Sequence, residues 1–194
     1  GFPIMGNAGA PVLSHEMPDT GAVSRARVQT SDDCTGMTLS PQWQWQAHEN
    51  RAWYRLTGSS LRLYAAGAPN LFHAGQYLSQ LMQAFHSRWE VRLSARFDRK
   101  GDRAGIGVLG YEYRYLCLEE GGLALYQGKA EERGRREAER VAEQCLLRIP
   151  YGDDRAALCM EIKDGRAAFS YIAPDGEEKA AGDPFPMAAG GWVG

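Results

Sequence analysis

The chain has 194 residues, of which 44% are hydrophobic and 24% charged, and these proportions exclude a disordered, collagen-like or coiled-coil protein. Its length fits one domain with an additional segment better than two full domains. Twenty-two basic residues nearly balance twenty-four acidic ones, so nucleic acid and an anionic membrane surface are not expected partners. Abundant glycine and aromatic residues favour short strands joined by tight turns.

The first 41 residues alternate little between apolar and polar side chains and contain many prolines and glycines. This composition is typical of an extended segment that runs over a surface. We expect residues 1–30 to form this segment and residues 31–194 to form one β-rich domain. The chain begins Gly-Phe-Pro and ends Gly-Gly-Trp-Val-Gly, which we interpret as a fragment truncated at its C-terminus, of undetermined compartment.

Alternating patterns begin at residue 42 and predict strands about ten residues apart. The clearest runs from Trp89 to Asp98, where apolar and polar residues alternate without a break. Residues 104–109 and 112–119 predict a hairpin, and residues 123–127 and 145–149 predict further strands. Residues 158–163 and 167–172 are joined by Asp164-Gly165, which suits a type I′ turn.

The charged segment from Lys129 to Glu143 fits two alternatives, a solvated helix or an excursion between two strands. No βαβ crossover is apparent elsewhere. The predicted fold class is therefore all-β, a two-sheet antiparallel β-sandwich with an extended N-terminal segment. No uncharged stretch predicts a membrane-spanning helix, since glycine, proline and amide side chains interrupt residues 63–87.

No catalytic constellation is visible in the sequence. Adjacent acids such as Glu119-Glu120 point to opposite faces of a strand, and we interpret them as turn or solvated residues. The four histidines and four cysteines lack metal-ligand or redox spacing, so neither a metal nor a cofactor is expected. Trp43 and Trp45 share one strand face, which we interpret as core in preference to a sugar-binding platform.

Five stretches, residues 32–47, 53–56, 61–64, 102–110 and 113–119, resemble the C-terminal concanavalin A-like sandwich of glycoside hydrolase family 43 β-xylosidases and α-L-arabinofuranosidases. Among them, Ser40-Pro-Gln-Trp-Gln-Trp45 and Tyr113-Arg-Tyr-Leu-Cys-Leu-Glu119 are long motifs. Residues 1–13 with Pro18-Asp19 resemble the last part of that family's five-bladed propeller and its exit linker. Cys34 departs from the pattern, since the family usually has Phe there.

The resemblance implies a jelly-roll accessory domain whose parent enzyme removes xylose or arabinose from hemicellulose. It places the catalytic Asp base, Glu acid and helper Asp on the propeller, so no catalytic residue is expected in this chain. The implied partners are that propeller and a pentose-containing oligosaccharide, and a homo-oligomer is left open. The particular pentoside is also left open.

A phenylalanine from this part of the sandwich closes one wall of the pocket in the resembling enzymes. Phe85, with His86 and Arg88, is the nearest match here and is the expected substrate-pocket lining. The alternative is that Phe85 is a core residue at a strand start. Two other functions also stay open, an independent carbohydrate-binding module and a purely structural or oligomerisation domain.

Overall fold

The computed structural model describes residues 6, 9, 10, 12, 14, 16, 18, 19, 21, 29–46, 48–82, 84–130 and 141–188. The chain divides into two compact units, residues 1–31 and 32–194. In the second unit almost all regular structure is antiparallel β, which confirms the predicted fold class. No helix in the described residues has the length and apolarity needed to cross a membrane.

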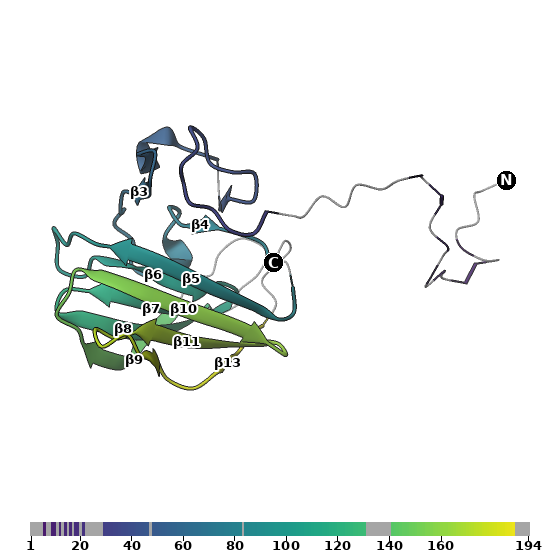
Figure 1. Ribbon diagram of the computed structural model, residues 1–194. Helices are drawn as coiled ribbons and strands as arrows, with labels where there is room; N and C mark the ends of the chain where they lie inside the picture. The colour runs from purple at the N-terminus through teal and green to yellow at the C-terminus, as the bar shows by residue number, and fades with distance from the viewer. Residues whose placement is uncertain are drawn as a thin grey trace. The chain divides into compact units, whose positions relative to one another are not determined.

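Two sheets form the sandwich, and Figure 1 shows them as stacked layers. The first contains β5 (Ser87–Ser94), β10 (Arg155–Lys163), β11 (Arg166–Ile172) and β12 (Glu178–Ala180), with β13 (Phe185–Pro186) paired to β11. The second contains β6 (Arg103–Val108), β7 (Glu112–Glu119), β8 (Gly122–Ala130) and β9 (Val141–Pro150) in that order. The predicted strands of residues 87–172 are thus present, several of them longer than expected.

The core lies between the two sheets because each strand turns alternate side chains inward. On β10 these are Ala156, Leu158, Met160 and Ile162, each no more than 6% exposed. They pack against leucines of β7 and β8, namely Leu116, Leu118, Leu123 and Leu125. Burying a leucine, isoleucine or methionine side chain contributes about 1.5–3 kcal/mol, so this layer is a large source of stability.

Residues 32–80 hold four short strands that do not join the sandwich sheets. β1 (Gln44–Trp45) pairs with β4 (Leu78–Ser79), and β2 (Tyr54–Leu56) pairs with β3 (Leu61–Leu63). Two 3₁₀ turns complete the segment, η1 (Arg51–Trp53) and η2 (Leu71–His73). Figure 1 shows this segment beside the sandwich. Strands were expected here, but alternation alone does not identify the partner with which a strand pairs.

The two alternatives for residues 129–143 are decided only at their ends. Residues 129–130 belong to β8 and residues 141–143 belong to β9, so both ends are strand. Residues 131–140 lie outside the described part of the chain, and so do most of residues 1–28.

Candidate functional site

An exposed apolar loop joins β4 to β5. We call residues 80–86 the apolar connector, because Leu81, Met82 and Phe85 are 60%, 49% and 83% exposed. Single exposed apolar side chains are common on soluble proteins, whereas several in one short loop mark a contact surface. The connector is therefore the candidate site. The sequence reasoning missed Leu81 and Met82, although their position just before a strong strand pattern was a usable signal.

The structure separates the three predicted pocket residues. Phe85 projects from the connector, so the alternative that it is a core residue is wrong. His86 lies next to it, and its Nε2 is 2.9 Å from Oδ1 of Asp164 in the β10–β11 turn. Arg88 instead donates two 3.0 Å hydrogen bonds to Glu178 on the outer face of the first sheet. Phe85 and His86 thus share one loop, while Arg88 is occupied elsewhere.

Arg88 also covers a buried thiol. Its Nη2 lies 3.3 Å from Sγ of Cys159, which is fully buried. Burial raises the pKa of this thiol, and the hydrogen bond from Arg88 lowers the pKa of Glu178. The arrangement links β5 to β12 across β10 and β11.

A second cluster of charged side chains covers the outer face of β6–β9. We call it the Arg–Glu–Tyr network, and its members are Arg103, Tyr113, Tyr115, Glu119, Tyr126, Glu143 and Arg148. The guanidinium of Arg103 lies 3.7 Å from the centroid of the Tyr126 ring. Glu119 and Glu143, on either side of it, are only 12% and 11% exposed. The interpretation of Glu119 as a solvated residue is therefore wrong.

The network occupies the face on which a saccharide could otherwise lie. Tyr113, Tyr115 and Tyr126 are at most 6% exposed, and their rings stack in sequence at 6.3 Å and 5.3 Å between centroids. Burial raises the pKa of Tyr113 and Tyr115, and Glu143 adds to both shifts. Both carboxylates accept hydrogen bonds from arginine and tyrosine, so neither faces an open space as a glycosidase acid or base must.

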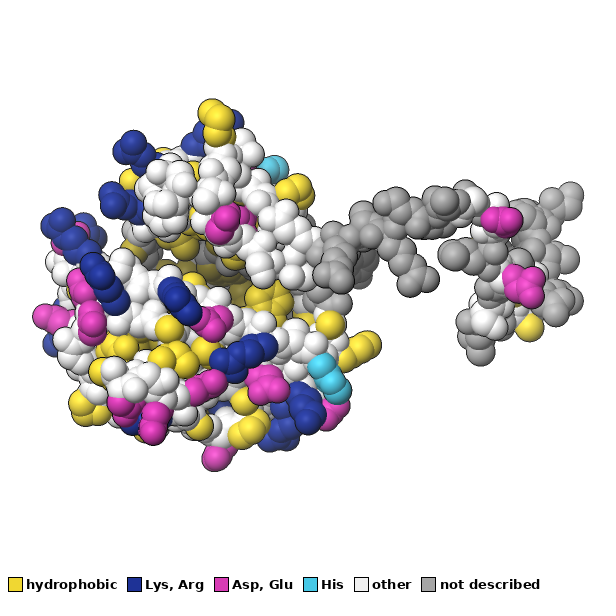
Figure 2. Space-filling model, viewed as in Figure 1, with side chains coloured by type: hydrophobic (Ala, Val, Ile, Leu, Met, Phe, Trp, Pro, Cys, Tyr) yellow, Lys and Arg dark blue, Asp and Glu magenta, His cyan; other side chains and the backbone are white. Residues whose placement is uncertain are grey.

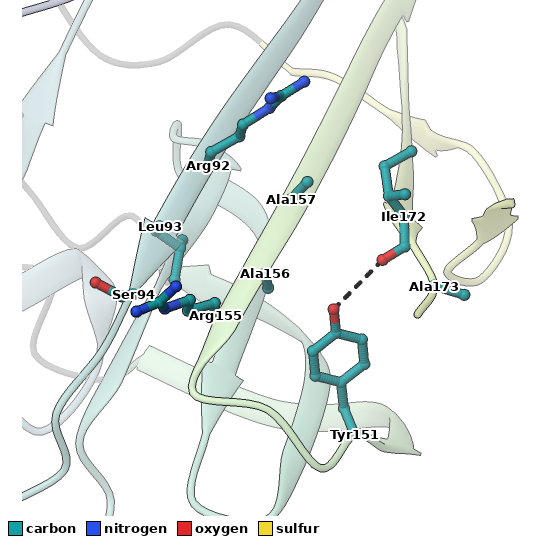
Figure 3. A pocket seen from close by; sticks show the side chains of 9 residues that line it. All are labelled: Arg92, Leu93, Ser94, Tyr151, Arg155, Ala156, Ala157, Ile172 and Ala173. Carbon is teal, nitrogen blue, oxygen red and sulfur yellow. Dashed lines mark hydrogen bonds between the residues drawn. The ribbon is translucent and has the colours of Figure 1, made fainter. Parts of the chain in front are cut away.

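A shallow hollow of about 530 Å³ lies at one end of β5, β10 and β11. Figure 3 shows Arg92, Ser94 and Arg155 on one side and Tyr151 on the other. The Tyr151 hydroxyl donates a 3.4 Å hydrogen bond to the carbonyl of Ile172, and Arg92 pairs with Glu90 at 3.0 Å. The lining contains no carboxylate, so it offers no acid–base pair for hydrolysis.

The tryptophans of residues 42–53 form a cluster of their own. Trp45 packs against Trp53 and Tyr54, each 5.5 Å away between ring centroids, and Trp43 donates a 2.7 Å hydrogen bond to Asp32. Trp43, Trp45 and Trp53 are all half-buried. They are thus neither sandwich core nor an open platform, and the interpretation of Trp43 and Trp45 as core is only partly right.

Polar side chains in the same segment lack partners. Among the described residues, buried side-chain atoms without a hydrogen bond occur on Gln42, Trp45, Gln76 and Gln80. All four lie in residues 42–80, outside the sandwich. No group of three or more metal-ligating side chains occurs in the described ranges.

The comparisons with known proteins agree with this fold. Residues 31–194 match the family described as the β-xylosidase C-terminal concanavalin A-like domain of glycoside hydrolase family 43, and the chain belongs to that family. The match confirms the resemblance seen in the sequence motifs. No curated protein sequence matches the chain.

Solved structures show the same fold at low identity. A xylan β-1,4-xylosidase from Bacillus halodurans C-125 is 18% identical with a TM-score of 0.69, over 87% of this chain and 33% of its own. The glycoside hydrolase family 43 protein BlXynB from Bacillus licheniformis is 20% identical with a TM-score of 0.61, over 81% of this chain and 31% of its own. The chain therefore spans about a third of the solved proteins it matches.

Proposed function

We propose that this chain is the accessory sandwich of a glycosidase that hydrolyses xylosides or arabinosides in hemicellulose. In this proposal the domain packs on the catalytic propeller of its parent and helps to shape the substrate pocket. The observation that carries the proposal is the apolar connector, which exposes Leu81, Met82 and Phe85 together. Family membership and the xylosidase named among the similar structures support the choice of substrate class.

The segment before the connector supports a packing surface for the same reason. A buried polar atom without a hydrogen bond costs about 1–3 kcal/mol, so the packing of residues 42–80 is suboptimal here, and a rearrangement of this segment on a partner could supply the missing bonds. Figure 2 shows a recess with hydrophobic side chains at its floor, beside the segment that carries β3 and β4 in Figure 1. A partner that fills this recess would bury the apolar side chains at its floor.

Phe85 is the residue proposed to reach the pocket. An aromatic wall excludes water from the bound pentose, and a drier site strengthens the electrostatic action of the acid and base. The effect contributes about 1–3 kcal/mol to transition-state stabilisation, which is roughly 5- to 150-fold in kcat/KM.

The test is Phe85→Ala in the full-length parent enzyme. We expect kcat/KM for a nitrophenyl pentoside to fall by roughly 5- to 150-fold. The melting temperature should change little, because Phe85 is 83% exposed on this domain and contributes little to the folding of the sandwich.

The matched control is Leu146→Ala, which truncates a 41% exposed leucine on β9. It should leave kcat/KM of the folded enzyme unchanged, with a small fall in the melting temperature because the side chain is partly buried. Unchanged kcat/KM in Phe85→Ala would contradict the pocket role. Binding of the isolated domain to xylan in affinity electrophoresis would favour an independent carbohydrate-binding module instead.

A further inference from the structure

Few hydrogen bonds join the apolar connector and its preceding segment to the sandwich. Strands β1–β4 and β2–β3 pair only with each other, so no ladder joins residues 32–80 to either large sheet. In the described part of the chain, hydrogen bonds from residues 32–86 to the sandwich occur at two places. One is η2 at Leu71–Phe72, and the other is His86. The connector therefore follows the first anchor in the sequence and ends at the second.

The two anchors differ in strength. His86 and Asp164 are 65% and 72% exposed, and an ion pair so open to solvent contributes little. Glu143, by contrast, is 11% exposed and accepts a 3.2 Å hydrogen bond from the backbone N–H of Leu71. Hydrogen bonds to a carboxylate are stronger than those between neutral groups.

Glu143 is itself held in place by three further donors. The hydroxyls of Tyr113 and Tyr115 donate to it at 2.7 Å and 3.1 Å, and Nη1 of Arg103 donates at 2.9 Å. These donors come from β6 and β7, so the position of the carboxylate is set by the second sheet. Around it, Leu71 and Phe72 pack against the buried tyrosines, and the Phe72 ring stacks on Tyr111.

We infer that Glu143 is a positioning residue, which fixes η2 on the second sheet and thereby sets where the apolar connector presents Phe85. We call the hydrogen bond from the backbone N–H of Leu71 to Glu143 the clamp. The catalytic consequence rests on the proposed function, but the clamp itself is a property of this chain. Glu143 has no hydrogen bond to the described residues of the connector, so it acts through residues 71–79. Loss of the clamp changes the geometry of the pocket wall while the sandwich core stays packed.

The first experiment compares Glu143→Gln with Glu119→Gln in the full-length parent. Both variants remove one carboxylate charge from the same Arg103, but Glu119 makes no contact with η2. Hydrogen–deuterium exchange should speed up for peptides within residues 71–86 in Glu143→Gln by about tenfold or more, the factor expected for a lost charge-assisted hydrogen bond. In Glu119→Gln these peptides should exchange as in the wild type. Equal exchange in the two variants would overturn the clamp.

The second experiment is a double-mutant cycle with Phe85→Ala. If Glu143 acts through Phe85, Glu143→Gln lowers kcat/KM by about tenfold alone and has no further effect in the Phe85→Ala background. Glu119→Gln should leave kcat/KM of the folded enzyme unchanged. Additive effects of Glu143→Gln and Phe85→Ala would overturn the positioning role.

The outcomes separate the two proposals. A silent Phe85→Ala contradicts the proposed function, whatever Glu143→Gln does. The exchange experiment then still decides the clamp, since it needs no activity. Fast exchange at residues 71–86 confined to Glu143→Gln supports the clamp, and unchanged exchange contradicts it.

Discussion

Gly128 on β8 makes room for Tyr113, a member of the Arg–Glu–Tyr network. The ring of Tyr113 lies across it and so reaches Glu143 on the next strand, β9. A Cβ at residue 128 would overlap this ring and come within 2.5 Å of its Cε1 atom. Real Cβ atoms do not approach so closely, which makes glycine a packing requirement here.

We expect Gly128→Ala to lower the free energy of unfolding by about 1–3 kcal/mol, the usual cost of overfilling a packed site. Urea denaturation followed by fluorescence measures the change. Gly152→Ala is the control, since a Cβ there meets no atom within 4 Å and the variant should stay within about 0.5 kcal/mol of wild type. Equal stability of the two variants would contradict the close packing of Tyr113 on residue 128.

At the scale of elements, the hairpin of β10 and β11 was the best predicted part of the fold. Asp164 and Gly165 have φ angles of +49° and +71°, as a type I′ turn requires. Alternation also located β5, although it ends at Ser94 rather than Asp98. These elements are local, so sequence pattern and turn chemistry are sufficient to define them.

The candidate site was only partly predictable. Phe85 was predicted from a motif resemblance. Its exposure depends on how residues 32–80 pack on the sandwich, which the sequence does not show. The role of Glu143 was missed because it ends the charged segment 129–143, where a helix competed with a strand. Its four donors come from residues 28 to 72 positions away in the sequence, and no local pattern encodes such a meeting.

The turn gives a test at this scale. Gly165→Val should lower the free energy of unfolding by about 1–2 kcal/mol, because a β-branched residue at positive φ is strained. Asp164→Asn serves as a control, since asparagine tolerates the same backbone region while the pair with His86 loses its charge. Thermal unfolding should therefore separate the variants, with Asp164→Asn near wild type. Comparable losses in both would mean that the His86 pair, not the backbone, sustains the hairpin.

For the whole molecule, buried tyrosines and a buried thiol link stability to alkaline pH. Burial raises the pKa of Tyr77 and of Cys117 to about 12, and it raises the pKa of Tyr113 and Tyr115 as well. A raised pKa in the folded state means that the folded protein holds its proton more tightly than the unfolded chain. The corresponding stability is complete below the unfolded values and is lost as the pH rises above them.

We therefore expect the free energy of unfolding to decline from about pH 9–10 upward, by at most about 1.4 kcal/mol per pH unit for each group. Urea titrations at intervals between pH 8 and pH 11.5 measure the slope. Tyr77→Phe removes one of the groups and should make the decline shallower. A stability that is constant or rises over this range would contradict the assignment.

Each sheet of the sandwich holds one fully buried thiol, Cys117 on β7 and Cys159 on β10, both at most 1% exposed and neither in a disulfide, whereas Cys34 and Cys145 are only partly buried. A thiol-specific reagent reaches Cys117 only when the cluster of Tyr113, Tyr115 and Tyr126 opens, and it reaches Cys159 only when Arg88 leaves its hydrogen bond with the thiol. Labelling of the two cysteines therefore reports two different local openings of the sandwich. Their labelling rates, compared in one sample, reveal whether the two layers open together as a cooperative unit or one before the other.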